Sequence, residues 1–198
     1  MLTVSPGTDL EAILAEVHQT AAEEAQAYIL GAAHDGTTNR LHRTLRITQA
    51  DRRWLDVLSA LLVKIGKRSW IYREGSRSVW TLETTYCPHP TSLPSNGERC
   101  AFARGHFDAE GGVPKDPQAR FYIQFVQKNK EDLYRVRQIL SVLGIMSGRM
   151  HNPSAMVDSE YWRFYVRAAS WRRFIDRVSS WHPRKRAILE GRRRESLR

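Results

Sequence analysis

The sequence predicts an α+β fold built from two copies of one unit, and three observations lead to this prediction. A segment of the first half recurs 78 residues later, so that Gln49 corresponds to Gln127. In both copies apolar residues then follow at the spacing of one helix face, and a glycine (Gly66, Gly144) ends the pattern. Before each helix pattern, apolar and polar residues alternate with the period of two that is typical of a strand.

Composition narrows the classes of protein. The chain has 198 residues, of which 41% are hydrophobic and 26% charged, enough for a sizeable core. Lys and Arg number 31 against 21 Asp and Glu, and the resulting net charge of +10 favours nucleic acid as a partner, although a merely basic protein has the same balance. No run approaches the roughly 18 apolar residues of a membrane span. Met1 to Leu10 lacks the pattern of a signal peptide, so we expect a cytoplasmic or organelle-interior protein that is not secreted.

Each copy carries the same succession of expected elements. A helix comes first, over roughly 10–34 and 98–109, and small residues four apart (Ala27 and Gly31; Ala101 and Gly105) let two such helices approach closely. A strand follows, with Leu41, Leu45 and Ile47 on its core face in the first copy. Gln49 and Gln127 are expected to open the next helix. A hairpin closes each copy, over 69–84 and 146–167, with Trp80 and Trp162 in like places.

Changes in composition suggest the domain limits. Residues 1–86 form the first repeat, and 87–97, which are rich in Pro, Ser and Gly, form a linker. Residues 98–198 form the second repeat, which ends in a basic tail from Arg192 to Arg198.

The two first helices each end in an acid followed by glycine, Asp35-Gly36 and Glu110-Gly111. A helix end already presents free carbonyl groups and negative potential, so two adjacent carboxylates there repel each other. A divalent cation that prefers oxygen ligands, Mg²⁺ above all, relieves this repulsion. Beside a basic surface, such a site favours metal-assisted phosphodiester hydrolysis. An acid followed by glycine is also a common structural helix end, and the duplication is what favours the functional interpretation.

The residues around these acids resemble a known family. Tyr28 to Gly36 (YILGAAHDG) and Phe102 to Gly111 (FARGHFDAEG) are similar to the signature of the LAGLIDADG homing endonucleases. The placement of Gln49 and Gln127 and the segment Trp181 to Arg186 (WHPRKR) also resemble archaeal-type members with two motifs in one chain. Four residues separate Gly31 from Asp35, whereas five separate Gly105 from Glu110, so either the first helix packs in a shifted register or the two glycines are not equivalent.

The resemblance implies a monomer with two pseudo-symmetric αββαββα repeats, each with a twisted antiparallel sheet, which together form a DNA-binding saddle. It implies a site-specific endonuclease that cleaves a long asymmetric double-stranded DNA target, leaves short 3′ overhangs and serves intron homing. Asp35 and Glu110 would hold Mg²⁺, with Mn²⁺ as a substitute and Ca²⁺ supporting binding only. Gln49 and Gln127 would order solvent, and Lys185, or as second choice Lys128, would be the assisting lysine.

The polar strand faces are candidates for reading base edges, because twisted β-ribbons fit the major groove. An Arg- and Thr-rich face is equally typical of a solvated surface. The candidates are Arg40, His42, Arg46, Thr48, Tyr72, Arg77 and Thr81 in the first copy, and Arg120, Tyr122, Gln124, Arg149, Arg163 and Tyr165 in the second.

Two other functions of the same fold stay open: an RNA maturase and a DNA-binding protein that does not cleave. An acid retained in both copies favours the nuclease, since a pure binding protein has no physical need for two adjacent carboxylates.

Overall fold

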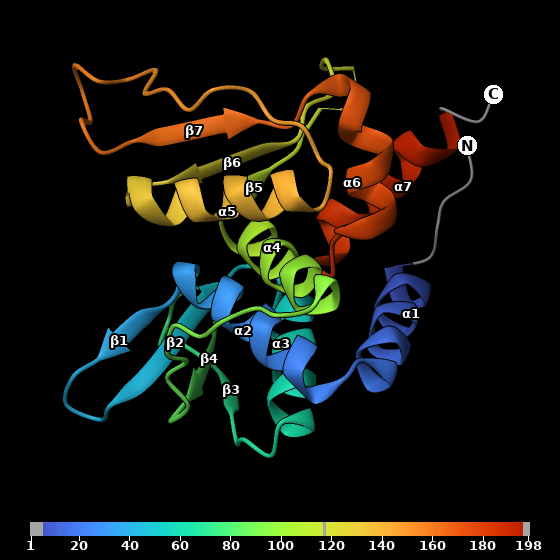
Figure 1. Cartoon of the computed structure of the whole chain (residues 1–198). Coiled ribbons are helices and arrows are strands. Elements are labelled where there is room, and N and C mark those ends of the chain that lie inside the picture. The colour runs from blue at the N-terminus through green and yellow to red at the C-terminus, as the bar shows by residue number, and fades with distance from the viewer. Residues whose placement is uncertain (1–5, 117, 196–198) are drawn as a thin grey trace.

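The computed structural model describes residues 6–116 and 118–195, in which the order helix, two strands, helix, strands occurs twice (Figure 1). The first repeat contains α2 (Ala22–Ala32), η1 (Ala33–Asp35), β1 (Thr37–Asn39), β2 (Thr44–Gln49), α3 (Arg52–Lys64), β3 (Trp70–Arg73) and β4 (Trp80–Thr84). The second contains α4 (Asn96–Glu110), β5 (Gly111–Gly112), β6 (Gln124–Gln127), α5 (Lys130–Val142), β7 (Trp162–Tyr165), η2 (Ala168–Ser170) and α6 (Trp171–Arg177). Helices α1 (Pro6–Gln19) and α7 (Pro183–Glu195) flank the two repeats.

Each repeat has an antiparallel sheet, with strand order β1-β2-β4-β3 in the first and β5-β6-β7 in the second. Within residues 6–116 and 118–195 the second sheet has, in place of a fourth strand, the bridges Ser147 to Val166 and His151 to Arg163. Gln49 pairs with Trp80 in the first sheet, and Gln127 pairs with Trp162 in the second. The expected correspondence of the two glutamines and the two tryptophans is therefore present in the strand register.

Helices α3 and α5 end in the same way, as the glycines predict. Gly66 and Gly144 have φ of 70° and 72°, a conformation that costs glycine little. In each case the residue after the glycine donates its N–H to a carbonyl five residues earlier, Lys67 to Leu62 and Ile145 to Leu140, both at 2.8 Å. This is the hydrogen bond of a Schellman motif, which turns the chain from the helix toward the following hairpin.

Helices α2 and α4 pack against each other between the two sheets (Figure 1). At their crossing, a Cβ atom placed on Gly31 would lie 2.2 Å from the carbonyl oxygen of Phe102. One placed on Gly105 would lie 2.1 Å from that of Tyr28. The two glycines therefore play the same part in the two helices, and each lets the backbone of the other helix come close.

The unequal spacing in the two motifs is absorbed by η1. Between Gly31 and Asp35 the chain takes one α-helical step and three 3₁₀ steps, whereas α4 remains α-helical to Glu110. A 3₁₀ helix rises about 2.0 Å per residue and an α-helix about 1.5 Å, so both routes advance the chain by about 7.5 Å. The glycines are thus equivalent and the helix register is kept.

Several expected boundaries were wrong. The first helix is two helices, α1 and α2, with a bend at 20–21, because α1 turns away to pack on α3 and α7. Gln49 and Gln127 end strands instead of opening helices, whose N-caps are Asp51 and Asn129. Leu41 does not face the core: it lies in the turn between β1 and β2 and is 84% exposed.

The region between the repeats is close to the expected linker. Residues 85–95 contain no helix or strand, and α4 begins at Asn96, where Ser95 and Glu98 form a capping box. The expected basic tail is helical up to Glu195, and the rest of it lies outside the described residues. Among the described residues, no helix has the length and apolarity needed to span a membrane.

Candidate functional site

The packing of α2 against α4 brings the two acidic helix ends together. Charge repulsion between Asp35 and Glu110 contributes to the raised pKa of Glu110, so the carboxylates lie within electrostatic reach of each other. Burial is the larger cause, and together these effects raise the pKa of Glu110 to about 7. Burial also raises the pKa of Asp35. The two carboxylates that the sequence singled out therefore form one centre.

Gln49 belongs to this centre. Its Nε2 donates a hydrogen bond to Oδ2 of Asp35 at 2.6 Å, and this bond opposes the effect of burial on the pKa of Asp35. Because Gln49 is the last residue of β2, the end of the strand lies beside the end of η1. The matching Gln127 also ends its strand, but its Oε1 accepts from the backbone N–H of Lys128 at 2.7 Å.

Of the two candidate lysines, Lys185 lies at the centre. It is only 4% exposed, and its Nζ donates to the carbonyl oxygens of Phe107 and Asp108, at 2.7 Å each. These carbonyls belong to the last turn of α4, where a cation is favoured. Burial lowers the pKa of Lys185 to about 8, against the opposing charges of Asp108, Asp35 and Glu110. The side chain of Lys128 is 73% exposed, and its Nζ lies 3.9 Å from Oδ2 of Asp158.

The centre has the chemistry of a site for a hard divalent cation. Two carboxylates with raised pKa values gain stability when a cation replaces their protons. Within the described residues no group of three or more His, Cys, Asp or Glu side chains could hold a metal. Two carboxylates leave most of the coordination of Mg²⁺ to water and a phosphate, which is the usual arrangement for this ion. They do not fit a site in which protein side chains alone surround the cation.

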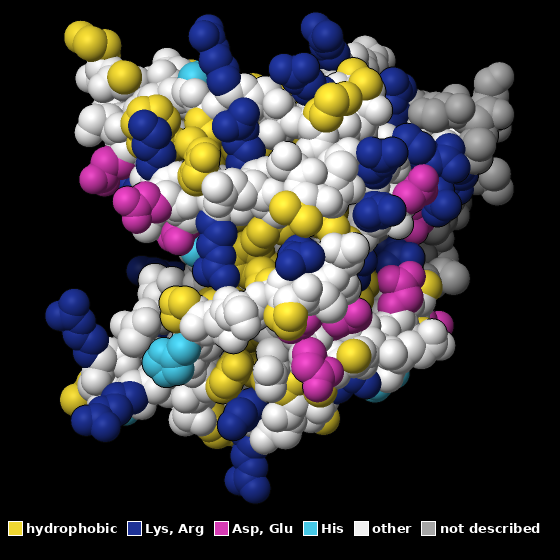
Figure 2. Space-filling model, viewed as in Figure 1, with side chains coloured by type: hydrophobic (Ala, Val, Ile, Leu, Met, Phe, Trp, Pro, Cys, Tyr) yellow, Lys and Arg dark blue, Asp and Glu magenta, His cyan; other side chains and the backbone are white. Residues whose placement is uncertain are grey.

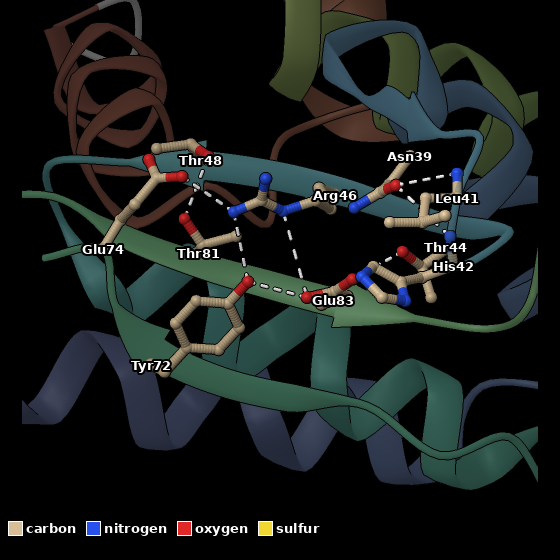
Figure 3. Close-up of polar contacts among 10 residues, drawn as sticks. All are labelled: Asn39, Leu41, His42, Thr44, Arg46, Thr48, Tyr72, Glu74, Thr81 and Glu83. Atoms are coloured by element: carbon tan, nitrogen blue, oxygen red, sulfur yellow. Dashed lines mark hydrogen bonds and ion pairs between the residues drawn. The ribbon is translucent and has the colours of Figure 1, made fainter.

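A second group of candidate residues lies on the polar face of the first sheet, where Figure 3 shows a connected network. Arg46 of β2 donates through Nη2 to Tyr72 Oη at 3.1 Å and to Glu74 at 2.7 Å. Tyr72 of β3 donates to Glu83 of β4 at 2.7 Å, and Thr44 donates to the same carboxylate (Figure 3). Arg46 is thereby held between two acids.

The remaining candidates of the first repeat differ in exposure. Arg40 and His42 are exposed in the turn between β1 and β2, where Asn39 Oδ1 accepts from the backbone of Leu41 and His42 (Figure 3). Arg77 is exposed in the turn between β3 and β4. Thr48 and Thr81 face each other, with their hydroxyl oxygens 3.1 Å apart, and Thr81 is fully buried.

Three candidates of the second repeat, Arg163, Tyr122 and Gln124, lie around Tyr165 in β7. The Arg163 guanidinium lies 5.4 Å from the centre of the Tyr165 ring, and the Tyr122 ring packs edge-on at 6.0 Å. His151 stacks on the same ring at 6.2 Å. Gln124 of β6 pairs with Tyr165 of β7. Arg120, which precedes β6, and Arg149, two residues before His151, are exposed.

Sequence reasoning missed three members of these surfaces: Glu74, Glu83 and His151. Glu83 alternates with the apolar residues of β4, so it was readable as a polar-face residue. Only the pairing of Arg46 with Glu83 reveals that the face carries acids beside an arginine. His151 lies within the expected hairpin 146–167, and only the structure shows that it bridges to Arg163.

Both basic and acidic side chains border the space between the two halves of the molecule (Figure 2). Figure 2 shows Lys and Arg side chains over both halves of the visible face, and a hollow at the left edge between the halves. In the same view of Figure 1, this hollow lies beside the end of α2, between the two sheets. The two sheets and the acidic centre therefore border one concave region.

Two sheets on either side of a helix pair whose paired ends are acidic define the class: this is a two-repeat LAGLIDADG fold. Residues 97–179, which include most of the second repeat, match the family model described as the LAGLIDADG-like domain. No curated protein matches the chain by sequence.

Solved structures with the same fold cover nearly the whole chain. Mesophilic variants of the homing endonuclease I-DmoI match with a TM-score of 0.62 and 17% identity, over 86% of this chain and 98% of that one. I-DmoI in complex with DNA and Ca matches with a TM-score of 0.61 over the same shares. The N-terminal LAGLIDADG domain of DUF199/WhiA matches with a TM-score of 0.67 and 15% identity, over 90% of this chain and 91% of that one. At such low identity these matches establish the fold alone.

Proposed function

We propose that this chain is a site-specific double-strand DNA endonuclease that hydrolyses phosphodiester bonds with a divalent metal and leaves short 3′ overhangs. The observation that carries the proposal is the centre formed by Asp35 and Glu110 at the ends of the paired helices, in a chain with a net charge of +10. Two partly buried carboxylates, both with a pKa raised by burial and one also by the charge of the other, cost folding free energy. A surface that only binds a polyanion gains nothing from them.

In this proposal Asp35 and Glu110 would hold Mg²⁺. Mn²⁺ would replace Mg²⁺, whereas Ca²⁺ would bind at the same site without supporting cleavage. When bound, the cation would activate water and stabilise the charge that develops on the phosphate. The amide of Gln49 keeps the Asp35 carboxylate oriented through its 2.6 Å hydrogen bond. Lys185 keeps a positive charge beside both carboxylates, and Gln127 would order solvent near the second strand of the duplex.

The two sheets would read the target. The first presents Arg46 between two acids, and the second presents Arg163, Tyr165 and His151, so the two half-sites are read by different chemistry. A long, asymmetric target follows from this difference. The chain would act as a monomer on double-stranded DNA, in the cytoplasm or an organelle interior, in the service of intron homing. I-DmoI, whose fold the chain shares, is a homing endonuclease whose structures contain DNA with Mn or Ca.

A second candidate function is DNA binding without cleavage, or its RNA-binding counterpart, a maturase. The observation that favours it is Lys185, because its ammonium group already supplies a buried cation at the end of α4. The chain also shares its fold with the LAGLIDADG domain of DUF199/WhiA, a protein that is not named as an endonuclease.

Selection from a random duplex library tests the proposal. Duplexes captured in Ca²⁺ are challenged with Mg²⁺, and the ends of any products are sequenced. We expect a double-strand break with 3′ overhangs at one asymmetric sequence. A selected duplex that stays intact in both Mg²⁺ and Mn²⁺ contradicts cleavage and favours the binding function, and a preference for structured RNA over every duplex favours the maturase.

A further inference from the structure

Among the side chains that the structure describes, the most completely buried acid lies beside the proposed centre but does not face it. Asp108, in the last turn of α4, is 1% exposed. Its Oδ2 accepts from Tyr28 Oη at 2.7 Å and from the backbone N–H groups of Trp181 and His182 at 2.8 and 3.2 Å. Its Oδ1 accepts from the hydroxyl of Ser180. Since four donors surround this carboxylate, it is not available to a metal, although it lies two residues from Glu110.

Three of these four donors belong to one short segment, 180–182, that connects α6 to α7. This segment leaves α6 through Ser179, which has φ of 55° and so lies in the left-handed region that serine seldom adopts. Arg104 packs over the Trp181 ring, 4.3 Å from its centre, and donates to the carbonyl of Val178. The segment is therefore held by side chains of α4, together with Glu16 of α1, which accepts from Trp181 Nε1 at 3.0 Å.

Helix α7 begins immediately afterwards at Pro183, and Lys185 lies in its first turn. The position of the Lys185 ammonium at the end of α4 is thus set by where the segment 180–182 is fixed. Tyr28 extends the connection to the first repeat, because its hydroxyl also accepts from Trp54 Nε1 at 2.9 Å. Asp108 lies two residues before Glu110, and the corresponding residue of the first repeat, two before Asp35, is Ala33. The first repeat therefore has no acid at this position.

We propose that Asp108 is a positioning residue, which clamps segment 180–182 and thereby places the Lys185 ammonium beside Asp35 and Glu110. This inference rests on the proposed function for the chemical use of Lys185, but not for the clamp itself. It also accounts for the asymmetry of the chain: one clamp, in the second repeat only, delivers one lysine to a centre that both repeats share.

The clamp is tested first without any cleavage, by amine labelling and mass spectrometry of Lys185. The wild-type ammonium is 4% exposed and doubly hydrogen-bonded, so it should react slowly. In Asp108→Asn we expect Lys185 to react at least about tenfold faster, while the exposed Lys128 reacts at an unchanged rate. Ser180→Ala keeps the carboxylate charge and removes one donor, and should give an intermediate rate. We expect Ser180→Ala to perturb the fold less than Asp108→Asn does, so it serves as the test variant if Asp108→Asn unfolds.

If labelling changes in Asp108→Asn but not in Ser180→Ala, the effect comes from charge and the clamp is overturned. Unchanged labelling in both variants also overturns it.

A double-mutant cycle then tests the functional consequence in single-turnover cleavage of the selected duplex. Asp108→Asn should slow cleavage about 10- to 100-fold when Lys185 is present, as expected for a group displaced by about 1 Å. In a Lys185→Met background the same change should slow it less than about twofold. Affinity for the duplex in Ca²⁺ should stay within about threefold in all variants. Equal losses in both backgrounds contradict positioning through Lys185. If the wild type does not cleave at all, the proposed function fails while the labelling result still decides the clamp.

Discussion

Asp35 and Glu110 occupy matching places in the two repeats, yet their surroundings differ. Asp35 receives the amide of Gln49, which counteracts part of the effect of burial on its pKa. For Glu110, burial and the Asp35 charge outweigh the charge of Lys185, and its pKa reaches about 7. Each acid stands at the end of a helix that carries the small residues needed for close packing, and from this the sequence predicted that the two acids lie near each other. It did not predict the difference between them, which arises from a strand end that only the first repeat brings into hydrogen-bonding distance.

The raised pKa of Glu110 makes folding stability depend on pH. A folded-state pKa above the unfolded value near 4.5 means that stability is fully present at low pH and is lost as the pH rises toward 7. Glu110→Gln removes this loss, so we expect it to raise the free energy of unfolding by about 1–3 kcal/mol at pH 8. At pH 4 the variant and the wild type should be equal. Denaturant unfolding at the two pH values measures this, and a variant that is destabilised at pH 8 would show that the carboxylate is favourably paired.

Glu83 bears on how the first sheet binds DNA. Its carboxylate accepts from Thr44 and Tyr72 and faces Arg46 on a surface that is otherwise suited to phosphate. Glu83→Gln removes a negative charge and should increase the affinity for unselected duplex about two- to fivefold at low salt, since non-specific binding is electrostatic. Discrimination between the selected and unselected duplexes should fall. Fluorescence anisotropy measures both affinities, and unchanged discrimination would place Arg46 outside the base-reading surface.

At the scale of elements, the helix pair α2 and α4 positions everything else. Repeated small residues were sufficient to predict the paired helices α2 and α4. C′ glycines were sufficient to predict where α3 and α5 stop, because both signals are local. The split between α1 and α2, and the replacement of a fourth strand by two bridges in the second sheet, were not predictable. They depend on what packs against each segment, which local periodicity does not encode. The 3₁₀ turn at 33–35 is the compensation that keeps the shortened first motif in register.

Gly105→Ala tests this close packing. Its Cβ would lie 2.1 Å from the carbonyl oxygen of Tyr28, so the helices must separate, and we expect a loss of about 1–3 kcal/mol in the free energy of unfolding. Gly191→Ala is the matched control, since Gly191 is also helical and nothing lies within 4 Å of the added atom. The control should be neutral or stabilising by up to about 1 kcal/mol. Thermal unfolding of both variants gives the comparison, and equal stability would contradict the close approach.

At the scale of the whole molecule, duplication and charge were both visible in the sequence. The two copies of one unit and the two motifs that resemble the LAGLIDADG family were enough to predict the fold. The net charge of +10 favours a nucleic-acid partner, which stays a prediction. The resemblance ranked Lys185 above Lys128, but periodicity does not show how Lys185 comes near the two acids, because it is far from both in sequence and reaches the centre through the packing of α7. Nor could the acids beside Arg46 be foreseen without the pairing of β2 with β4.

The net charge predicts strongly salt-dependent binding. A protein of this charge that contacts six to ten phosphates should lose about 10³- to 10⁵-fold in affinity between 50 and 200 mM salt. Titration of a selected duplex at several salt concentrations measures the slope. A nearly flat dependence would mean that the basic surface does not lie along the DNA backbone.

The central claim is that Asp35 and Glu110 together hold the divalent cation that cleavage requires. Its most direct test is single-turnover cleavage of the selected duplex by the wild type, Asp35→Asn and Glu110→Gln, with affinity measured in parallel in Ca²⁺. The account predicts cleavage in Mg²⁺ by the wild type alone, none in EDTA, and affinities for all three within about threefold of one another. Cleavage by both variants at the wild-type rate, or by the wild type in EDTA, would contradict it.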